Sequence, residues 1–447
     1  MGKINLEMKE TIFKPQVVFS KATGRANNYR IPSICYLGKG RVLAVADERF
    51  FGCGDNPNRV DKVARISNDN GNSWGNQISV VEEVGVSKFK SSASIDPSSL
   101  YDDSTNTIFI LYSHTPAGVG ILNCKRSTGY SSGNKILVSK GKKYEIRNNE
   151  LFFKNKPTNI KVDLSRNLST GGNYKDGSSR FKEIPTSYLM LIKSTDKGLN
   201  WDNPVCLNSS IKDSKWGFIG ACPGSGIKLS SGAKTGRLIF PIYYGLRTFP
   251  LNLTFSCVYS DDGGNSWSLG KPPLIKGRFP KKNPLFVPQR SWLSETQLCE
   301  LENGNILAFI RNHHPKKRVM CSLSTDGGET FGKVFFLNNI PQPICQISAI
   351  SFLHHGIKMV AILNAASEKK REKGTLRISL DGGKTFPYFK IIAENEFAYS
   401  SMAYLGDGTI GILYEDTLKH ECIKFVKFAP EDILSSRHFE PSLPSTN

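Results

Sequence analysis

Short apolar runs separated by turn-forming residues recur along most of the chain. Runs of five to eight residues, such as RVLAVA, TIFILY, NILAFI and KMVAIL, are bounded by Gly, Asn, Asp and Pro. Such runs are typical of β-strands joined by tight turns. Because apolar positions rarely follow the spacing of a long helix, the pattern predicts an all-β protein.

Five turn segments share the pattern Ser-x-Asp-x-Gly-x-x-aromatic. They are SNDNGNSW (67–74), STDKGLNW (194–201), SDDGGNSW (260–267), STDGGETF (324–331) and SLDGGKTF (379–386). In a tight hairpin the Asp carboxylate accepts backbone N–H groups, and Gly supplies a positive φ. We therefore expect the Asp of each segment to be structural rather than catalytic, and its aromatic residue to pack on the hairpin.

The spacing of these turns predicts a repeat architecture. The central residues Asp69, Asp196, Asp262, Asp326 and Asp381 are 127, 66, 64 and 55 residues apart. One four-stranded blade per 55–66 residues fits a β-propeller, and the interval of 127 residues fits two blades or one blade with an insertion. We predict that residues 1–447 form one six-bladed β-propeller.

Residues 124–185 differ from the rest of the chain. They are rich in Lys, Asn, Ser and Gly and contain none of the repeated turns. We predict a small β-rich subdomain with flexible loops, inserted between blades.

The composition is that of a folded protein with a sizeable core. Of the 447 residues, 39% are hydrophobic and 22% are charged, which excludes disordered, collagen-like and small disulfide-rich classes. We expect no transmembrane segment, because no apolar stretch is long enough to cross a bilayer. The start, MGKINLEMKETIF, lacks the apolar centre of a signal peptide, so the sequence alone leaves the localisation open, including the cytoplasm.

The ten cysteines form neither a CxxC pair nor a zinc-type cluster. We expect buried free thiols, with disulfides as the alternative, and no metal or cofactor.

The net charge of +20 would attract anionic ligands. The basic residues are scattered in short runs, such as 140–143, 280–282, 314–318 and 368–373. No long basic tail or aromatic-interleaved motif accompanies them, so we do not expect nucleic acid as a partner. Solvated loops and the steering of an anionic ligand are the two remaining interpretations.

Three further motifs contain residues able to do chemistry. They are YRIPSI (29–34), ADERFFGCGDNPN (46–58) and EFAYSSMAYLGDGTIGILYE (396–415). In a propeller, residues from different blades meet at one end of the axis, so a site distributed along the sequence is expected.

Together with the five turns, these motifs resemble the sialidase (neuraminidase) family, in particular the bacterial exo-sialidase catalytic domain. The resemblance extends from YRIP at 29 to LYE at 415. It implies a retaining exo-α-sialidase, a monomer without a cofactor that releases terminal sialic acid from glycoproteins, glycolipids and oligosaccharides. It also implies a secreted or cell-surface protein.

The resemblance assigns three arginines to the substrate carboxylate, which sialic acid carries on its anomeric carbon. They are Arg30, Arg311 and Arg371. Arginine suits this role because its planar guanidinium pairs bidentately with a carboxylate and stays charged. The nearby alternatives are Arg318 and Arg377.

The resemblance also assigns the catalytic groups. Tyr399 corresponds to the nucleophile, and Glu295 to the carboxylate that activates it, with Glu300 as the nearby alternative. Sialidases with a Tyr nucleophile are a known exception among glycosidases, and a neutral Tyr is not repelled by the substrate carboxylate. Asp55 corresponds to the acid/base, with Asp61 as the alternative.

The loop that carries Asp55, FFGCGDNPN, departs from the family pattern, because it lacks the polar aromatic or His residues often found beside the acid.

Supporting roles follow from the same resemblance. Glu415 corresponds to the carboxylate that holds Arg30, because clustered arginines repel one another and need a counter-charge. Arg49 and Asp96 correspond to the pair at the 4-hydroxyl and N-acetyl side of the sugar. The alternative for Asp96 is a structural Asp-Pro turn.

Two functions remain as alternatives. One is an intramolecular or intermolecular trans-sialidase, which Trp216 or Trp292 would favour by stacking over the site and excluding water, although core packing is the other interpretation of both. The second is a catalytically silent sialic-acid lectin, which would need only the arginines. A protein-binding scaffold would leave the complete set of catalytic residues unexplained.

Overall fold

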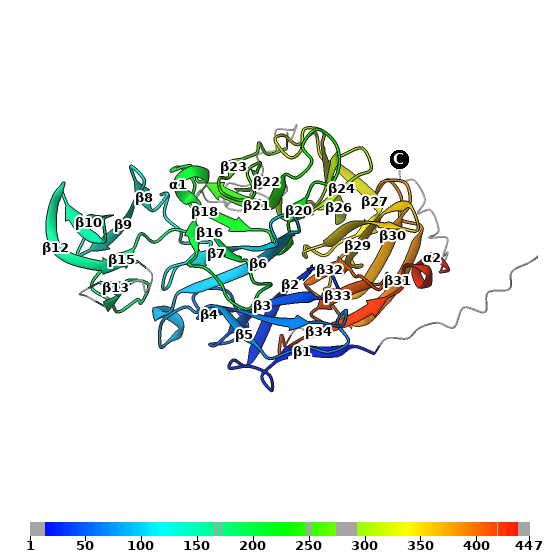
Figure 1. Cartoon of the computed structure of the whole chain (residues 1–447), viewed down its shortest axis with the longest axis horizontal. Helices are drawn as coiled ribbons and strands as arrows, with labels where there is room; N and C mark the ends of the chain where they lie inside the picture. The colour runs from blue at the N-terminus through cyan, green and yellow to red at the C-terminus, as the bar shows by residue number, and fades with distance from the viewer. Residues whose placement is uncertain are drawn as a thin grey trace, which may run out of the picture.

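The computed structural model describes residues 14–164, 168–169, 172–246, 252–273, 293–417 and 419–436. Strands are the main regular secondary structure of these residues, and the all-β prediction is confirmed (Figure 1). The helices in the described part are short: η1 (Lys88–Lys90), α1 (Asn208–Ile211) and α2 (Pro430–Leu434). None of the described helices is long and apolar enough to cross a membrane.

Most of the described strands fall into six antiparallel sets of four. The first set is β2 (Asn28–Tyr36), β3 (Val42–Arg49), β4 (Val60–Ser67) and β5 (Ile78–Val81). The second is β6 (Ala93–Asp102), β7 (Thr107–Thr115), β16 (Tyr188–Ser194) and β17 (Val205–Cys206). The third is β18 (Phe218–Ala221), β21 (Leu238–Leu246), β22 (Asn252–Ser260) and β23 (Ser268–Leu269).

The fourth set is β24 (Leu293–Glu300), β25 (Ile306–Asn312), β26 (Arg318–Ser324) and β27 (Phe335–Pro341). The fifth is β28 (Ser348–His354), β29 (Ile357–Ala365), β30 (Glu372–Ser379) and β31 (Tyr388–Glu396). The sixth is β32 (Ser400–Tyr404), β33 (Ile410–Tyr414), β34 (Cys422–Phe428) and the N-terminal β1 (Gln16–Ser20). Pairing of β1 with β34 joins the two ends of the sequence in one sheet.

Apolar clusters link the sets into a closed ring. Each of six buried clusters contains side chains of two neighbouring sets, and one of them packs the sixth set against the first. In that cluster Phe19 and Phe425 of the sixth set meet Tyr29 and Val42 of the first. This closed order favours six blades, and the blade count itself stays a prediction.

The repeated turns have the same hydrogen bonds in all five places. At Asp262, the carboxylate accepts the Ser266 N–H at 2.9 Å and the Ser260 hydroxyl at 2.7 Å, while the Gly264 N–H donates to Ser260 Oγ at 2.8 Å. The aromatic residue Trp267 packs edge-on against Phe109 of the preceding set. The turns therefore fix a hairpin and seal the contact between neighbouring sets, a structural role for their Asp residues.

The long interval between the first two repeated turns contains most strands of the second set and a separate sheet. The chain leaves the second set after β7 and returns to it at β16. Between them lie β8 (Tyr130–Ser131), β9 (Asn134–Ser139), β10 (Lys142–Arg147), β11 (Glu150–Phe153), β12 (Lys156–Asp163), β13 (Leu168–Ser169), β14 (Gly172–Asn173) and β15 (Lys182–Glu183). They form a separate sheet with its own core, which includes Leu137, Leu151 and Phe181. Figure 1 shows this sheet at the far left of the molecule. We infer that it is the inserted subdomain.

A buried polar network attaches the insertion to the propeller. His114 of β7 contacts Glu83 at 2.9 Å through Nδ1 and Glu183 of β15 at 2.7 Å through Nε2. Lys135 of β9 pairs with Glu183 at 2.6 Å, and Lys175 lies 3.6 Å from Glu83. Because all five side chains are at least largely buried, the network fixes β15 and β9 against β7.

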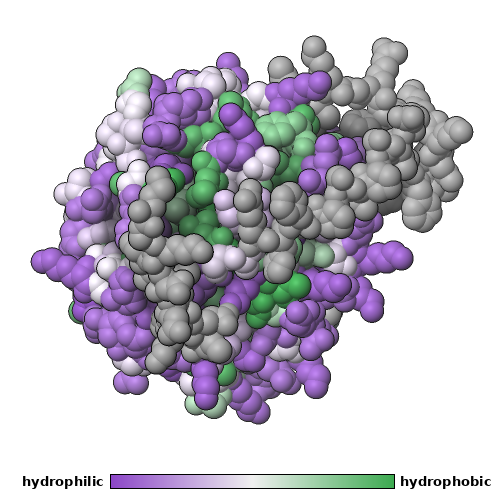
Figure 2. Space-filling model, turned by 90° about the vertical axis from the view of Figure 1, so that its right-hand side faces the viewer, coloured by the Kyte–Doolittle hydropathy of each residue, from purple (hydrophilic) through white to green (hydrophobic). Residues whose placement is uncertain are grey.

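Two short strands complete the fold: β19 (Gly224–Ser225), which pairs with β6, and β20 (Ile227–Lys228), which pairs with β21. All ten cysteines lie in the described part of the chain and are free thiols. The face seen in Figure 2 is mainly hydrophilic, with hydrophobic side chains gathered towards its middle.

Candidate active site

A pocket of about 280 Å³ collects most of the site residues predicted from the sequence. Seven of those residues line it: Arg30, Asp55, Asp96, Glu295, Arg311, Arg371 and Tyr399. The other two, Arg49 and Glu415, lie behind this lining and hydrogen-bond to Asp55 and Arg30. The predicted site residues thus come together from five of the six sets, while their catalytic roles stay predictions.

Bulges in the first strand of three sets turn site residues toward the pocket. The register shifts between Arg30 and Ser33 in β2, between Ile95 and Ser98 in β6, and between Leu293 and Thr296 in β24. Within the first two bulges Ile31 and Asp96 have positive φ values of 58° and 62°, which are uncommon for residues with a side chain. Bulges often re-aim a side chain beside an active site.

Arg30 is held by a buried carboxylate. Its Nη2 donates to Glu415 Oε2 at 3.3 Å, and the Ile31 N–H donates to Glu415 Oε1 at 2.8 Å. Burial opposes ionisation of Glu415, but Arg30, His420 and the Ile31 N–H lower its pKa to about 2. Glu415 is therefore a carboxylate in the folded protein and fixes the position of Arg30.

Tyr399 lies at the centre of the charged groups. Its hydroxyl donates to Glu295 Oε1 at 2.8 Å and accepts a hydrogen bond from Arg311 Nη1 at 2.8 Å. Arg311 Nη1 also contacts Glu295 Oε2 at 2.5 Å. Burial and the Glu295 charge raise the pKa of Tyr399 well above its usual value, so the phenol is neutral and has a carboxylate placed to take its proton.

Two more arginines flank the Tyr399 ring. The guanidinium carbons of Arg30 and Arg371 lie 5.3 and 5.6 Å from the ring centroid, within the range of a cation–π contact. Arg371 stands directly before β30. Three positive groups therefore surround one phenol.

Asp55 stands opposite a fully buried arginine. Its side chain is 65% exposed, and Oδ1 accepts a hydrogen bond from Arg49 Nη1 at 2.8 Å. Desolvation by the surrounding pocket opposes ionisation of Asp55, but the charges of Arg49, Arg30 and Arg311 lower its pKa. Arg49 in turn pairs with Asp47 at 2.8 Å, which holds the guanidinium in place beneath Asp55.

Asp96 has the opposite electrostatic environment. It is buried within β6, rather than opening a turn, and lines the pocket. Burial, followed by the charges of Asp55, Asp47 and Glu295, raises the pKa of Asp96 well above its usual value. A neutral carboxylic acid at this position can donate a hydrogen bond to a ligand oxygen.

The nearby alternatives named from the sequence lie elsewhere. Arg318 pairs with Glu368 at 2.5 Å, and Arg377 donates to Asn364 at 3.3 Å. Glu300 accepts hydrogen bonds from the Ser230 and Ser231 segment.

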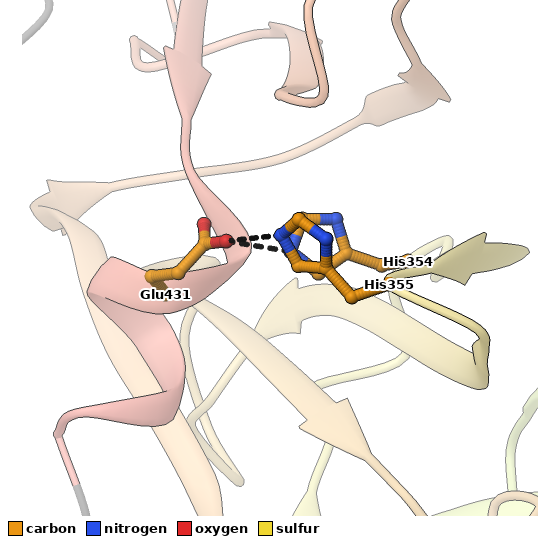
Figure 3. A group of neighbouring side chains, drawn as sticks. All are labelled: His354, His355 and Glu431. Carbon is orange, nitrogen blue, oxygen red and sulfur yellow. Dashed lines mark hydrogen bonds and ion pairs between the residues drawn. The ribbon is translucent and has the colours of Figure 1, made fainter.

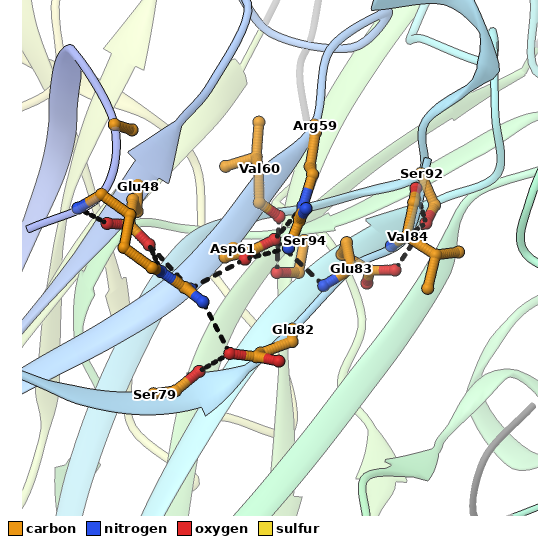
Figure 4. Close-up of polar contacts among 12 residues, drawn as sticks. Glu48, Arg59, Val60, Asp61, Ser79, Glu82, Glu83, Val84, Ser92 and Ser94 are labelled. Atoms are coloured by element: carbon orange, nitrogen blue, oxygen red, sulfur yellow. Dashed lines mark hydrogen bonds and ion pairs between the residues drawn. The ribbon is translucent and has the colours of Figure 1, made fainter. Parts of the chain in front are cut away.

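Asp61, the alternative to Asp55, is buried with Arg59 at 2.9 Å and Arg25 at 3.0 Å. Figure 4 shows Asp61 within a polar cluster that also contains Glu48 and Glu82, and none of these residues lines the pocket.

Sequence reasoning missed several pocket residues. His313, Thr115, Asn56 and Tyr243 also line it. His313 follows Arg311 by two residues, the spacing that puts side chains on the same face of a strand, so this signal was readable. Burial and the charges of Arg311 and Lys317 lower the pKa of His313 to about 4.

Among the described residues, neither Trp216 nor Trp292 is found over the pocket. Trp216 stacks on Tyr244 with ring centroids 3.6 Å apart and packs against a hydrophobic cluster. Trp292 lies outside the described residues.

One other group of side chains has the composition of a metal site. His354, His355 and Glu431 place their ligand atoms within 4.8 Å of one another (Figure 3). Both ring nitrogens of His354 already have partners, Tyr404 at 2.8 Å and Glu431 at 2.7 Å. The group therefore attaches α2 to the end of β28, and it lies outside the pocket lining.

Comparison with known proteins decides the family. The BNR repeat-like domain family matches residues 170–412. Similar curated proteins are the anhydrosialidase of Macrobdella decora (26% identity, 91% of this chain and 60% of that protein), the sialidase of Micromonospora viridifaciens (27%, 87% and 50%) and sialidase B of Streptococcus pneumoniae (27%, 90% and 63%). This chain belongs to the BNR repeat-like domain family.

Solved sialidase structures share the fold of this family member. The leech intramolecular trans-sialidase superposes with a TM-score of 0.80 at 23% identity, covering 95% of this chain and 71% of that one. The intramolecular trans-sialidase of Ruminococcus gnavus has a TM-score of 0.79 at 23% identity, covering 95% and 99%. The predicted sialidase family and β-propeller fold are thus confirmed. The chain spans between half and two thirds of the length of the three curated relatives.

Proposed function

We propose that this sialidase-family protein is a retaining exo-α-sialidase that hydrolyses terminal sialic acid from glycoconjugates through a covalent intermediate on Tyr399. The observation that carries the proposal is the position of the Tyr399 hydroxyl, 2.8 Å from both Glu295 Oε1 and Arg311 Nη1. A lectin would need the arginines but not this phenol–carboxylate pair.

The arginines would bind the substrate carboxylate. Arg30, Arg311 and Arg371 line one pocket, and a guanidinium can pair bidentately with a carboxylate through two charge-assisted hydrogen bonds. Glu415 keeps Arg30 in position before substrate arrives. Asp96, as a neutral acid, would donate to a sugar hydroxyl.

The bound carboxylate would also prepare the acid. Arg49, Arg30 and Arg311 keep Asp55 ionised in the free protein. When the substrate carboxylate neutralises the arginine cluster, the pKa of Asp55 would rise, and the residue could hold the proton that it must donate.

The reaction then has two balanced steps. In the first, Glu295 takes the phenol proton, Tyr399 oxygen bonds to the anomeric carbon, and the bond to the leaving oxygen breaks as Asp55 protonates that oxygen. In the second step, Asp55 takes a proton from a water molecule, and the water oxygen attacks the anomeric carbon and displaces the Tyr399 oxygen. Tyr399 then recovers its proton from Glu295. Two displacements give net retention.

Intramolecular trans-sialidase activity is the second candidate. It is favoured by the relative named an anhydrosialidase and by the structural neighbours named intramolecular trans-sialidases. A hydroxyl group of the bound sugar would then replace water in the second step, with all protein groups in the same roles.

Time-resolved NMR of products from 3′-sialyllactose separates these functions. We expect free sialic acid, formed first as the α-anomer, and a Tyr399→Phe variant with almost no turnover. A Tyr404→Phe variant is the control, because the Tyr404 hydroxyl contacts His354 outside the pocket. An anhydro sugar as the product would favour the second candidate, whereas unchanged turnover by Tyr399→Phe would contradict both.

A further inference from the structure

The positive charge of the chain is concentrated in one region. Residues 124–185 contain 14 Lys and Arg against 5 Asp and Glu, a net charge of +9 out of +20 for the whole chain. The three catalytic-pocket arginines lie outside this region.

Part of this charge lines a groove at the base of the insertion. The groove has a volume of about 780 Å³. Six of its lining residues are basic and all six are exposed: Lys125, Arg126, Lys140, Lys143, Arg180 and Lys182. They come from the segment before β8, from the β9–β10 hairpin, and from the segment that ends at the start of β15. No Asp or Glu lines the groove.

The carboxylates closest in sequence are already paired elsewhere. Glu183 contacts His114 and Lys135, and Glu145 pairs with Arg147. In the described part of the chain, Lys140 and Lys143 have no ion-pair partner, and neither does Lys182. Such uncompensated like charges repel one another and favour a bound anion.

The walls of the groove are fixed to each other. The Lys125 N–H donates to the Pro185 carbonyl at 2.8 Å, and the Thr186 hydroxyl donates to the Lys125 carbonyl at 2.8 Å. On the other wall, Lys143 pairs with Val138 in the β9–β10 hairpin. A ligand would therefore meet basic side chains that stand on ordered strands and turns.

The lining chemistry favours an anionic glycan. The apolar residues of the groove are Val138, Ile184 and Pro185, and none of the lining residues is aromatic. Single-stranded nucleic acids depend on aromatic side chains for base stacking. Ser127, Ser139 and Ser179 supply hydroxyl groups instead. We propose that this basic groove binds a sulfated or carboxylated glycan chain, separately from the catalytic pocket.

Calorimetry with defined oligosaccharides tests the proposal. The probes are a heparin oligosaccharide, which carries sulfates, and a hyaluronan oligosaccharide, which carries only carboxylates, both at 150 mM NaCl. We expect at least one to bind, and the variant Lys140→Glu/Lys143→Glu to bind it at least about tenfold more weakly. The probe that binds more tightly identifies the anionic group, sulfate or carboxylate, that the groove prefers.

A second variant separates binding at the groove from attraction by the net positive charge of the protein. Lys333→Glu/Lys384→Glu makes the same change in net charge at exposed lysines of the propeller, and we expect it to change affinity less than about threefold. Equal losses in the two variants, no binding of either probe, or tighter binding of single-stranded DNA of equal charge would overturn the proposal. Turnover of 3′-sialyllactose should not differ between the variants, so failure of the proposed catalysis is measured separately.

Discussion

At the scale of single residues, Asp55 depends on its arginine neighbours. Arg49 is fully buried, donates to Asp55 at 2.8 Å and pairs with Asp47 on its other side. A carboxylate that must both give and take a proton works best when its pKa changes during the cycle. The position of Asp55 between arginines and open solvent suits such a change.

The variant Asp55→Asn tests this role. We expect turnover of 3′-sialyllactose to fall about 10²- to 10⁴-fold, because its sugar leaving group needs a proton. First-turnover release of an acidic aryl leaving group, measured by rapid mixing, should fall much less. Asp103→Asn is the control, since Asp103 is exposed and paired with Lys228 at 2.5 Å. Equal loss of first-turnover release with both substrates would show that Asp55 is not the acid.

Residue types and motifs located the pocket, but not the contacts beneath it. Arg30, Glu295 and Tyr399 could be identified from the sequence because each stands in a recognisable segment. The Asp47–Arg49 pair was missed, although the two residues stand two positions apart in β3 and so lie on the same face of the strand. The raised pKa of Asp96 could not be predicted either, since it comes first from burial and then from the charges of Asp55 and Asp47 in one segment and Glu295 in another.

At the scale of elements, bulges decide where site residues point. Apolar runs predicted the strands. In a strand without a bulge, successive side chains alternate between the two faces. The Pro residues of YRIP and of SIDPSS were the readable sign of the bulges in β2 and β6, because Pro lacks the N–H of a regular ladder. The bulge in β24 has no such marker, so its position could not be read from the sequence.

The junction between β7 and β15 should depend on pH. Burial opposes the charge of His114, but Glu83 and Glu183 raise its pKa. The raised pKa means that protonated His114 contributes its full stability below the ordinary His pKa of about 6.5, and that this contribution is lost as the pH rises through the folded-state value. Burial opposes ionisation of Glu83, but Lys175 and His114 lower its pKa to about 2, so its contribution is lost in acid.

The variant His114→Gln should destabilise the protein by about 3–5 kcal/mol at pH 6, because it removes the buried cation that lies between Glu83 and Glu183 and leaves each carboxylate with a single lysine. Urea unfolding at pH 5.5 to 9 measures the effect, which should shrink as the pH rises. His355→Gln, at a side chain 79% exposed, is the control. If the difference in free energy of unfolding between His114→Gln and the unmodified protein stayed constant over this pH range, that result would contradict a charged His114.

At the scale of the whole molecule, the turn spacing predicted the fold and left one ambiguity. The interval of 127 residues allowed two blades or one blade with an insertion, and the return of the chain from β7 to β16 favours the second arrangement. The sixth set has no repeated turn, because this turn connects the third and fourth strands of the other sets, whereas in the sixth set these strands are β34 and β1, from opposite ends of the sequence. Closure by β1 could not be read from turn spacing, because β1 precedes the first turn.

At this scale, parts of the net charge can be assigned to parts of the fold. The sequence offered solvated loops or ligand steering as explanations of +20. The fold gathers part of the charge in the groove of the insertion and uses three arginines for the pocket, so the two kinds of anion site proposed here lie in different parts of the molecule.

The most direct test of the account is the identity of the residue that carries the sugar. Incubation with 2,3-difluorosialic acid, whose fluorine at C3 slows loss of the sialosyl group, is followed by peptide mass spectrometry. The account predicts a single sialosyl adduct on Tyr399. An adduct on Glu295 or Asp55, or no adduct on a protein that still turns over 3′-sialyllactose, would contradict it.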